Sequence, residues 1–168
     1  MCKIGVSVKK IITIFILLTS MLYASSDSAL DAINTGNYKK AFSILDTKAK
    51  QGNINAIYNL SLMYYNGYGV DQNISKAAQL LETAAKAGHK KAVQNVGRIY
   101  MQAMDFDKAS LWLEQNAKEG DIGAYYLLSE IYVEQEKFKK AKKWAKKAIE
   151  AGNQEASLLW KEYNLQNY

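Results

Sequence analysis

The chain has 168 residues, of which 49% are apolar, and a formal net charge of +6. This length suits one domain with a real core and excludes two domains of ordinary size. The absence of proline favours a mostly helical protein, and the single cysteine excludes a disulfide within one chain.

Residues 1–26 have the order of features typical of a secretory signal peptide. Three lysines precede an apolar run from Ile11 to Ala24, and two serines follow it. The run has 14 residues, whereas a helix that crosses a bilayer needs roughly 20. We therefore expect cleavage, after Ala24 or after Ser26, rather than retention of the run as a membrane anchor.

Cleavage would leave residues 27–168 as a domain exported to the bacterial periplasm or secreted. Removing Lys3, Lys9 and Lys10 lowers the formal charge from +6 to +3, because 19 Lys and Arg then face 16 Asp and Glu. Cys2 would be lost as well, so we expect a fold that depends on packing alone and inserts into no membrane.

The region after residue 26 repeats itself at intervals of 36, 32 and 32 residues. One glycine series and two alanine series keep these intervals: Gly52, Gly88, Gly120 and Gly152; Ala41, Ala77, Ala109 and Ala141; Ala56, Ala92, Ala124 and Ala156. Such a period indicates stacked helical repeats.

Each period divides into two predicted helices. The segment "DSALDAINTG" predicts a shortened first helix, and "GNYKKA" begins the second helix of that pair. In the later pairs, apolar residues at spacings of four, three and four share one face of the first helix. A small residue (Ser61, Gly97 or Ser129) interrupts this face, where we expect a neighbouring helix to approach closely. The repeated glycines are expected to close the second helices in the left-handed conformation.

The repeat that contains "NGYGV", Asn66 to Val70, is four residues longer than the next. A phosphate-binding loop needs several glycines that open a helix after a strand. No strand is predicted here, so we expect Gly67 and Gly69 to lengthen a turn between two helices, with Val70 packed against the pair. The last segment, "QEASLLWKEYNLQN", repeats the first-helix pattern without a following partner and predicts a C-terminal capping helix.

The stretch "AIYNLSLMYYNGYGVDQNISKAAQLLETAAKAGH", Ala56 to His89, resembles a Sel-1-like repeat, a family related to tetratricopeptide repeats. The resemblance extends over roughly residues 27–165. It implies an all-α, right-handed α-solenoid of about four stacked helix pairs plus a C-terminal capping helix. It also implies a family of adaptors and scaffolds that bind many unrelated partners.

The tetratricopeptide resemblance implies that the first helix of each pair lines a concave groove. The expected groove residues differ from repeat to repeat, while the packing residues stay alike. This variation favours a groove that binds a peptide or protein segment, and the alternative is an ordinary solvated groove. The expected groove residues are Tyr58, Asn59, Leu62, Tyr65, Gln94, Arg98, Met101, Tyr126 and Glu130.

The densest charge lies in "KFKKAKKWAKK", where Lys139, Lys140, Lys143 and Lys147 are expected on the outer face of the last full pair. A solvated face explains these lysines, and contact with an anionic surface is the alternative. No nucleic-acid partner is expected, because no aromatic residues alternate with the lysines as single-strand binding requires.

The sequence indicates neither a catalytic site nor a metal site. His89 is the single histidine and is expected to be a surface turn residue, so neither a metal site nor a nucleophile pair is expected. No catalytic or phosphate-binding motif occurs, and no cofactor is expected. The sequence therefore predicts a non-catalytic interaction module of the cell envelope, with a protein that binds or modifies cell-wall polymer (peptidoglycan) as the alternative.

Overall fold

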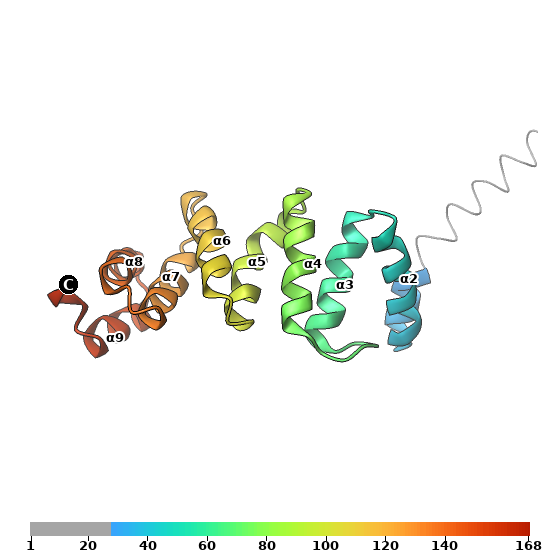
Figure 1. Cartoon of the computed structure of the whole chain (residues 1–168), viewed down its shortest axis with the longest axis horizontal. Helices are drawn as coiled ribbons and strands as arrows, with labels where there is room; N and C mark the ends of the chain where they lie inside the picture. The colour runs from blue at the N-terminus through green and yellow to red at the C-terminus, as the bar shows by residue number, and fades with distance from the viewer. Residues whose placement is uncertain (1–27) are drawn as a thin grey trace, which may run out of the picture.

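A computed structural model describes residues 28–168, which form a row of helices (Figure 1). Helical residues 28–34 come first and no strand occurs within this range. The helices that follow are α2 (Tyr38–Lys50), α3 (Ile54–Asn66), α4 (Ile74–Lys86), α5 (Lys90–Gln102), α6 (Phe106–Lys118), α7 (Gly123–Glu134), α8 (Phe138–Glu150) and α9 (Gln154–Glu162), with the 3-10 turn η1 (Leu165–Asn167). The predicted signal peptide lies outside the described residues.

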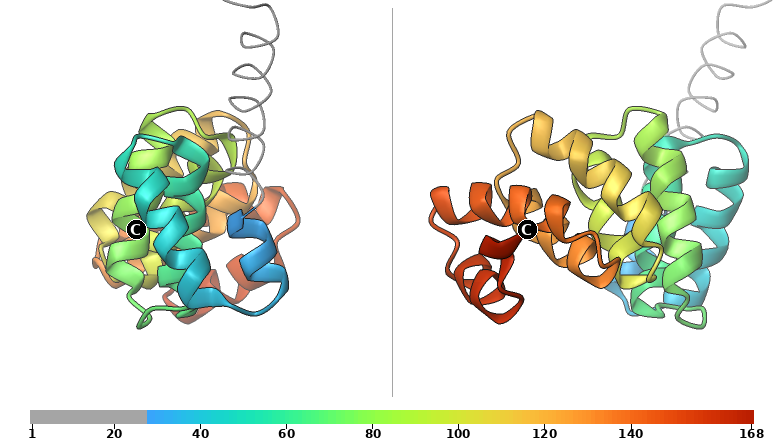
Figure 2. Two further views of the ribbon diagram at one scale, coloured as in Figure 1. Left: turned by 90° about the vertical axis from the view of Figure 1, so that its right-hand side faces the viewer. Right: turned by 60° about the vertical axis from the view of Figure 1, so that its left-hand side comes forward.

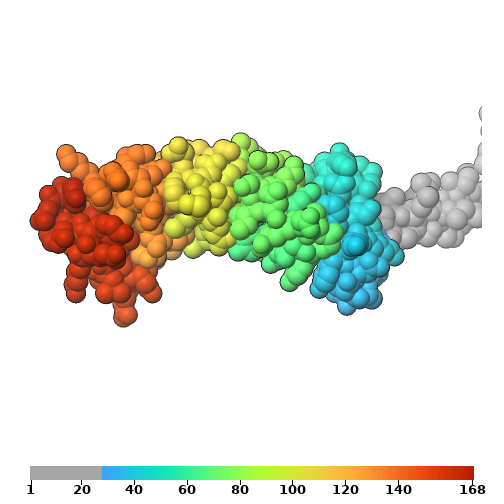
Figure 3. All heavy atoms as spheres, turned by 60° about the horizontal axis from the view of Figure 1, so that its bottom comes forward, coloured from blue at the N-terminus to red at the C-terminus, as the bar shows by residue number. Residues whose placement is uncertain are grey.

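Helices adjacent in sequence are adjacent in space. Each helix from α2 to α9 packs on the next one, and α9 also contacts α7. The result is an elongated body whose repeats succeed one another from end to end (Figure 3). Residues 28–34 pair with α2, α3 with α4, α5 with α6, and α7 with α8. The predicted all-α solenoid of about four helix pairs is confirmed.

The last helix, α9, has no second helix after it. It lies beside α7 and α8, and η1 packs on both α8 and α9 (Figure 2). Leu165 of η1 is fully buried. The predicted capping helix is therefore present, and the 3-10 turn covers part of the surface that a further helix would cover.

The ends of the helices follow from local sequence. Asparagine side chains before α2, α3, α4 and α9 each accept a hydrogen bond from a backbone N–H of the first turn. Such caps satisfy a donor that has no partner inside the helix. The predicted left-handed glycines are confirmed, with φ between +84° at Gly52 and +97° at Gly120.

The two alanine series lie at the centre of the packing. Ala41, Ala92, Ala109, Ala124, Ala141 and Ala156 are completely buried, and Ala56 and Ala77 nearly so. Gly97 of α5 faces Leu113 of α6, and a Cβ atom at Gly97 would lie only 2.7 Å from the Leu113 Cγ atom. The expected close approach of helices at the small residue is thus present in this pair.

The loop after α3 is a turn between two helices, as predicted, and it also reaches the preceding pair. Gly69 has φ +73°, and a Cβ atom there would overlap the backbone carbonyl of Tyr38, the first residue of α2. Tyr68 stacks on Tyr38 with ring centroids 4.7 Å apart and an angle of 15° between the rings. The longer loop therefore packs the pair α3 and α4 against α2 of the preceding pair.

A tyrosine links each of two repeats to the second helix before it. The Tyr100 hydroxyl of α5 donates to Glu82 Oε2 of α4, and the Tyr132 hydroxyl of α7 donates to Glu114 Oε1 of α6 at 2.6 Å. A lysine lies over each ring, with Lys108 Nζ 5.0 Å from the Tyr100 centroid and Lys140 Nζ 4.9 Å from the Tyr132 centroid. These contacts recur because they belong to the repeat rather than to one junction.

This link predicts a loss of stability in alkali. Burial and the hydrogen bond to Glu114 raise the pKa of Tyr132 to about 12, and burial and the bond to Glu82 raise the pKa of Tyr100. The pKa of each tyrosine is thus higher in the folded chain than the value of about 10 in the unfolded chain. The stabilisation that each tyrosine contributes is therefore fully present below pH 10 and is lost as the pH rises toward 12. We expect Tyr132→Phe to make this fall shallower, by up to about 1.4 kcal/mol per pH unit.

The measurement is urea unfolding at a series of pH values between 9 and 12. At neutral pH the same variant should be less stable than wild type by about 1 kcal/mol, since it leaves Glu114 without its hydroxyl donor. Tyr100→Phe should lower the free energy of unfolding in the same way. The effects of the two substitutions should be additive, because the two hydrogen bonds share no residue. An unaltered pH profile in both variants would rule out this contribution.

Candidate functional site

The predicted groove residues lie on the first helices α3, α5 and α7, and none of them is buried. Tyr58, Gln94 and Tyr126 hold equivalent positions in the three repeats. Leu62, Arg98 and Glu130 hold the equivalent positions one helical turn later, so the two rows share one face of each helix.

At the junction between α3 and α5, Tyr58 stacks on His89. The ring centroids are 4.2 Å apart and the rings are inclined by 18°. His89 is also the N-cap of α5, since its Nδ1 accepts a hydrogen bond from the Ala92 N–H at 3.2 Å. The sequence predicted only a surface turn residue. The capping role could have been predicted from the sequence, because His89 occupies the position of Asn53 and Asn153 in other repeats. The stack of Tyr58 on His89 could not.

At the junction between α5 and α7, Arg98 reaches the next repeat. Its Nη2 atom lies 3.5 Å from Asp121 Oδ2, and Asp121 Oδ1 accepts a hydrogen bond from the Gly123 N–H at 2.9 Å. A Cβ atom at Gly123 would lie 2.7 Å from Arg98 Nη2. The absence of a side chain at Gly123 therefore leaves room for the guanidinium group.

A cavity of about 440 Å³ opens beside this ion pair. Its lining residues are Gln94, Asn95, Arg98, Asn116, Glu119, Gly120 and Asp121. Asn116 of α6 is only 3% exposed, and its Nδ2 donates to the Gln94 carbonyl at 3.3 Å. Sequence reasoning did not assign Asn116 to the groove. The available signal was an asparagine at a position where the neighbouring repeats carry Ala84 and Ala148.

Within α7, the Tyr126 hydroxyl donates to Glu130 Oε1 at 2.6 Å. Burial, this hydrogen bond and the negative charges of Glu130, Glu155 and Glu162 raise the pKa of Tyr126. Leu158 of α9, which is 67% exposed, stands at the position equivalent to Tyr126. The face that carries the predicted residues thus continues onto the capping helix.

The remaining predicted groove residues contribute less specific contacts. Asn59 and Leu62 are exposed, and Met101 is half-buried against the core. The Tyr65 carbonyl accepts a hydrogen bond from Gln72 Nε2 at 2.8 Å. Of the nine predicted residues, the cavity brings together Gln94 and Arg98, and a hydrogen bond joins Tyr126 to Glu130.

The predicted basic face lies along α8. Lys139, Lys140, Lys143 and Lys147 are exposed. The ammonium groups of Lys143 and Lys147 lie 5.4 and 4.9 Å from the Trp144 ring centroid, while Trp144 itself is 7% exposed. Their aliphatic stems therefore cover apolar surface while their charges remain in water.

Residues 28–168 contain neither a cluster of metal-binding side chains nor a helix that could span a membrane. Within this range, no group of three or more His, Cys, Asp or Glu side chains has an arrangement that could hold a metal ion. None of the helices in the same range has both the length and the apolar character needed to span a membrane.

The chain was compared with known protein families and with solved structures. The family model for the Sel1 repeat matches residues 54–89 and 120–153. The search of curated proteins found no match.

One similar structure is a protective antigen present in uropathogenic Escherichia coli strains that displays an SLR fold. It matches with a TM-score of 0.57 and 19% identity, over 82% of this chain and 32% of that one. Another is a Sel1 repeat protein from Oxalobacter formigenes, with a TM-score of 0.52 and 26% identity, over 71% of this chain and 53% of that one. This chain thus spans about a third to a half of the length of these two proteins.

Proposed function

We propose that this chain holds a segment of another protein along α3, α5 and α7. The support from its relatives is the match of residues 54–89 and 120–153 to the Sel1 repeat, a scaffold type that mediates protein interactions. The proposed role is non-catalytic, as is typical of Sel1-repeat proteins. The single observation that carries it is the cavity beside Arg98, where variable groove residues and the buried Asn116 offer polar groups to an incoming chain.

The chemistry of this cavity suits an extended peptide. Amide side chains at Gln94, Asn95 and Asn116 offer both donors and acceptors, which an extended backbone needs for its own N–H and C=O groups. Tyr58 on one side and Tyr126 on the other offer rigid rings with large contact area at low entropic cost. The residues at these positions would then determine which partner binds, while the buried alanines maintain the packing between helices.

We further propose that the protein acts in the bacterial envelope or is secreted. The support is the order of features in residues 1–26, where lysines precede a short apolar run and small residues follow it. Edman sequencing of the protein purified from the periplasmic and secreted fractions tests this. A chain that begins at Ser25 or Asp27 supports export, and recovery from the cytosol with an intact N-terminus contradicts it.

The groove proposal predicts that Tyr58→Ala, Arg98→Ala and Tyr126→Ala together abolish capture of the partner. Truncating three central contact residues of an interface typically costs several kcal/mol, so we expect affinity to fall by about a hundredfold or more. The measurement is quantitative affinity capture from envelope extract, followed by titration with the purified protein that wild type retains.

The matched control removes three exposed side chains elsewhere, as Lys139→Ala, Lys143→Ala and Lys147→Ala. This variant should retain the partner, and both variants should keep the helical circular dichroism of wild type. Equal retention by the groove variant would refute the proposal. Cosedimentation of wild type with purified peptidoglycan, lost in the groove variant, would instead make cell-wall polymer the ligand.

A further inference from the structure

The second helix of three pairs begins with an aromatic residue: Tyr38 in α2, Phe106 in α6 and Phe138 in α8. Two of these rings are covered by a tyrosine that follows the first helix of the next unit. Tyr68, after α3, stacks on Tyr38 at 4.7 Å, and Tyr168, after α9, stacks on Phe138 at 4.6 Å. An aromatic ring at this position thus serves as a platform for a second ring.

The third platform, Phe106, has no covering ring among residues 28–168. The covering residue would have to come from the segment after α7, and this segment contains only Gln135, Glu136 and Lys137. By contrast, seven residues join α3 to α4, and six follow α9 to Tyr168. The chain is too short at this point, and has no aromatic residue, to repeat the stack.

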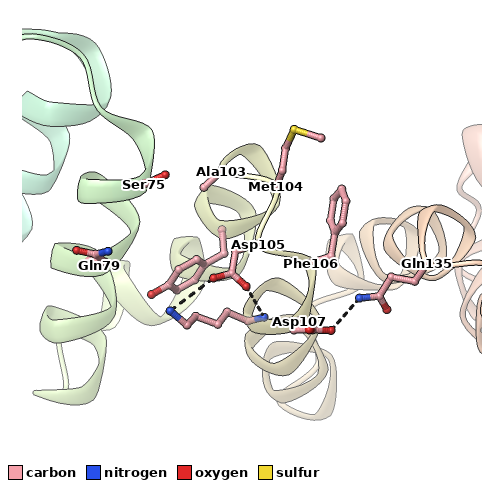
Figure 4. Close-up of a pocket in the computed structure, with 10 residues that line it drawn as sticks. Ser75, Gln79, Ala103, Met104, Asp105, Phe106, Asp107 and Gln135 are labelled. Carbon is pink, nitrogen blue, oxygen red and sulfur yellow. Dashed lines mark hydrogen bonds and ion pairs between the residues drawn. The ribbon is translucent and has the colours of Figure 1, made fainter.

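A cavity of about 550 Å³ borders the uncovered ring (Figure 4). Its lining residues are Ser75, Gln79, Tyr100, Ala103, Met104, Asp105, Phe106, Asp107, Lys108 and Gln135. In Figure 4 the side chains of Met104 and Phe106 point in the same direction, and no other drawn side chain lies across the Phe106 ring. Met104 is 75% exposed and has a left-handed backbone with φ +60°, a conformation that costs a non-glycine residue about 1 kcal/mol or more.

The lining of this cavity has a formal charge of −1, because it contains Asp105 and Asp107 but only one cation, Lys108. Lys108 lies 3.5 Å from Asp105 Oδ2, so these two charges offset one another. Asp107 accepts a hydrogen bond from Gln135 Nε2 at 3.0 Å and forms no ion pair within residues 28–168, while Lys137 Nζ donates to Oε1 of the same glutamine at 3.0 Å. A guest that carries positive charge therefore gains from this site, whereas an anionic guest is repelled.

We propose that Phe106 is an open stacking site, which receives an aromatic side chain flanked by a lysine or arginine from a partner protein. The partner supplies in trans the ring that Tyr68 and Tyr168 supply within the chain. The Phe106 ring offers its face, the Met104 thioether contacts the edge of the guest ring, and Asp107 attracts the neighbouring cation. This site is formed by α4, the end of α5, α6 and the turn after α7, and its lining shares no residue with the predicted groove.

The test uses acetyl-Lys-Tyr-Lys-amide as the probe and protein labelled with carbon-13 at the methionine methyl groups. Among the described residues, three methionines report separately: Met104 at the cavity, Met101 on the predicted groove and Met63 in the core. We expect the probe to shift the Met104 methyl signal saturably, with a dissociation constant in the millimolar range. Acetyl-Lys-Ala-Lys-amide should leave the signal in place, and the Met101 signal should stay unchanged with either peptide.

Phe106→Leu keeps apolar volume at the start of α6 but removes the ring, and it should weaken binding of the probe about fivefold or more. Asp107→Asn should weaken it as well and leave the fold intact, since an asparagine carbonyl can still accept the hydrogen bond from Gln135. This second variant keeps the test valid if Phe106→Leu unfolds. Absence of a saturable Met104 shift up to about 10 mM probe, or equal binding by these variants, overturns the proposal. A shift at Met101 instead would assign the probe to the groove and overturn it likewise.

Discussion

Gly69→Ala is expected to lower the free energy of unfolding by about 2–4 kcal/mol. Two costs combine, because the residue has φ +73° and because its new Cβ atom would overlap the Tyr38 carbonyl. The obstructing atoms belong to the backbone at the start of α2, so no side chain can rotate away. The loop must retreat, and the Tyr68 ring then loses its stack on Tyr38. Urea unfolding followed by circular dichroism measures the loss.

Gly36→Ala is the matched control for backbone conformation. Gly36 has nearly the same φ, +72°, but no atom lies within 4 Å of a Cβ atom placed there. Only the left-handed conformation then opposes alanine, at a cost of about 1 kcal/mol. Equal losses in the two variants would show that the contact between the loop and α2 contributes nothing.

Gly97→Ala and Leu113→Ala are each expected to be destabilising, yet the double variant should lose less than the sum. Leu113 is completely buried, and truncating such a leucine typically costs about 2–5 kcal/mol. Alanine at Gly97 gains about 1 kcal/mol of helix propensity, but its Cβ atom would lie 2.7 Å from Leu113 Cγ and 3.2 Å from the Leu113 backbone nitrogen. Overpacking of this kind costs about 1–3 kcal/mol.

With Leu113 shortened, the methyl group that Gly97→Ala introduces has space and fills part of the cavity. We expect a coupling energy of about 1 kcal/mol or more in the double-mutant cycle. Leu128→Ala is the control, because Leu128 is also fully buried but is not among the atoms nearest Gly97. Its effect should add to that of Gly97→Ala. Additivity in both cycles would contradict the account of close packing between α5 and α6.

The neighbouring repeat already shows the alternative solution. At the positions equivalent to Gly97 and Leu113, it carries the larger Ser129 and the smaller Ala145. Ser129 is completely buried, and its hydroxyl donates to the Tyr126 carbonyl at 2.6 Å. In this repeat a larger residue on the first helix accompanies a smaller one on the second. The preceding repeat instead carries Ser61 with Leu81, so each repeat packs this contact in its own way.

The repeat architecture of this protein could be predicted from its sequence alone. The three series at intervals of 36, 32 and 32 residues record contacts that every repeat makes, so buried alanines, left-handed glycines and helix pairs all followed from the period. The placement of the predicted groove residues on α3, α5 and α7 also followed from the period, whereas their role in one binding groove stays a prediction.

Contacts that belong to one junction were decided only by the tertiary structure. The Tyr58 stack on His89 and the position of Asn116 beside Gln94 each occur once among the described residues. The cover of Tyr68 on Tyr38 recurs only at the other end of the stack, where Tyr168 covers Phe138. Such contacts depend on how far a particular loop extends and on which two side chains neighbouring repeats bring together. The period cannot record them, because it retains only what successive repeats have in common. The uncovered Phe106 ring has the same origin, since the three residues after α7 are too few to carry a ring back to it.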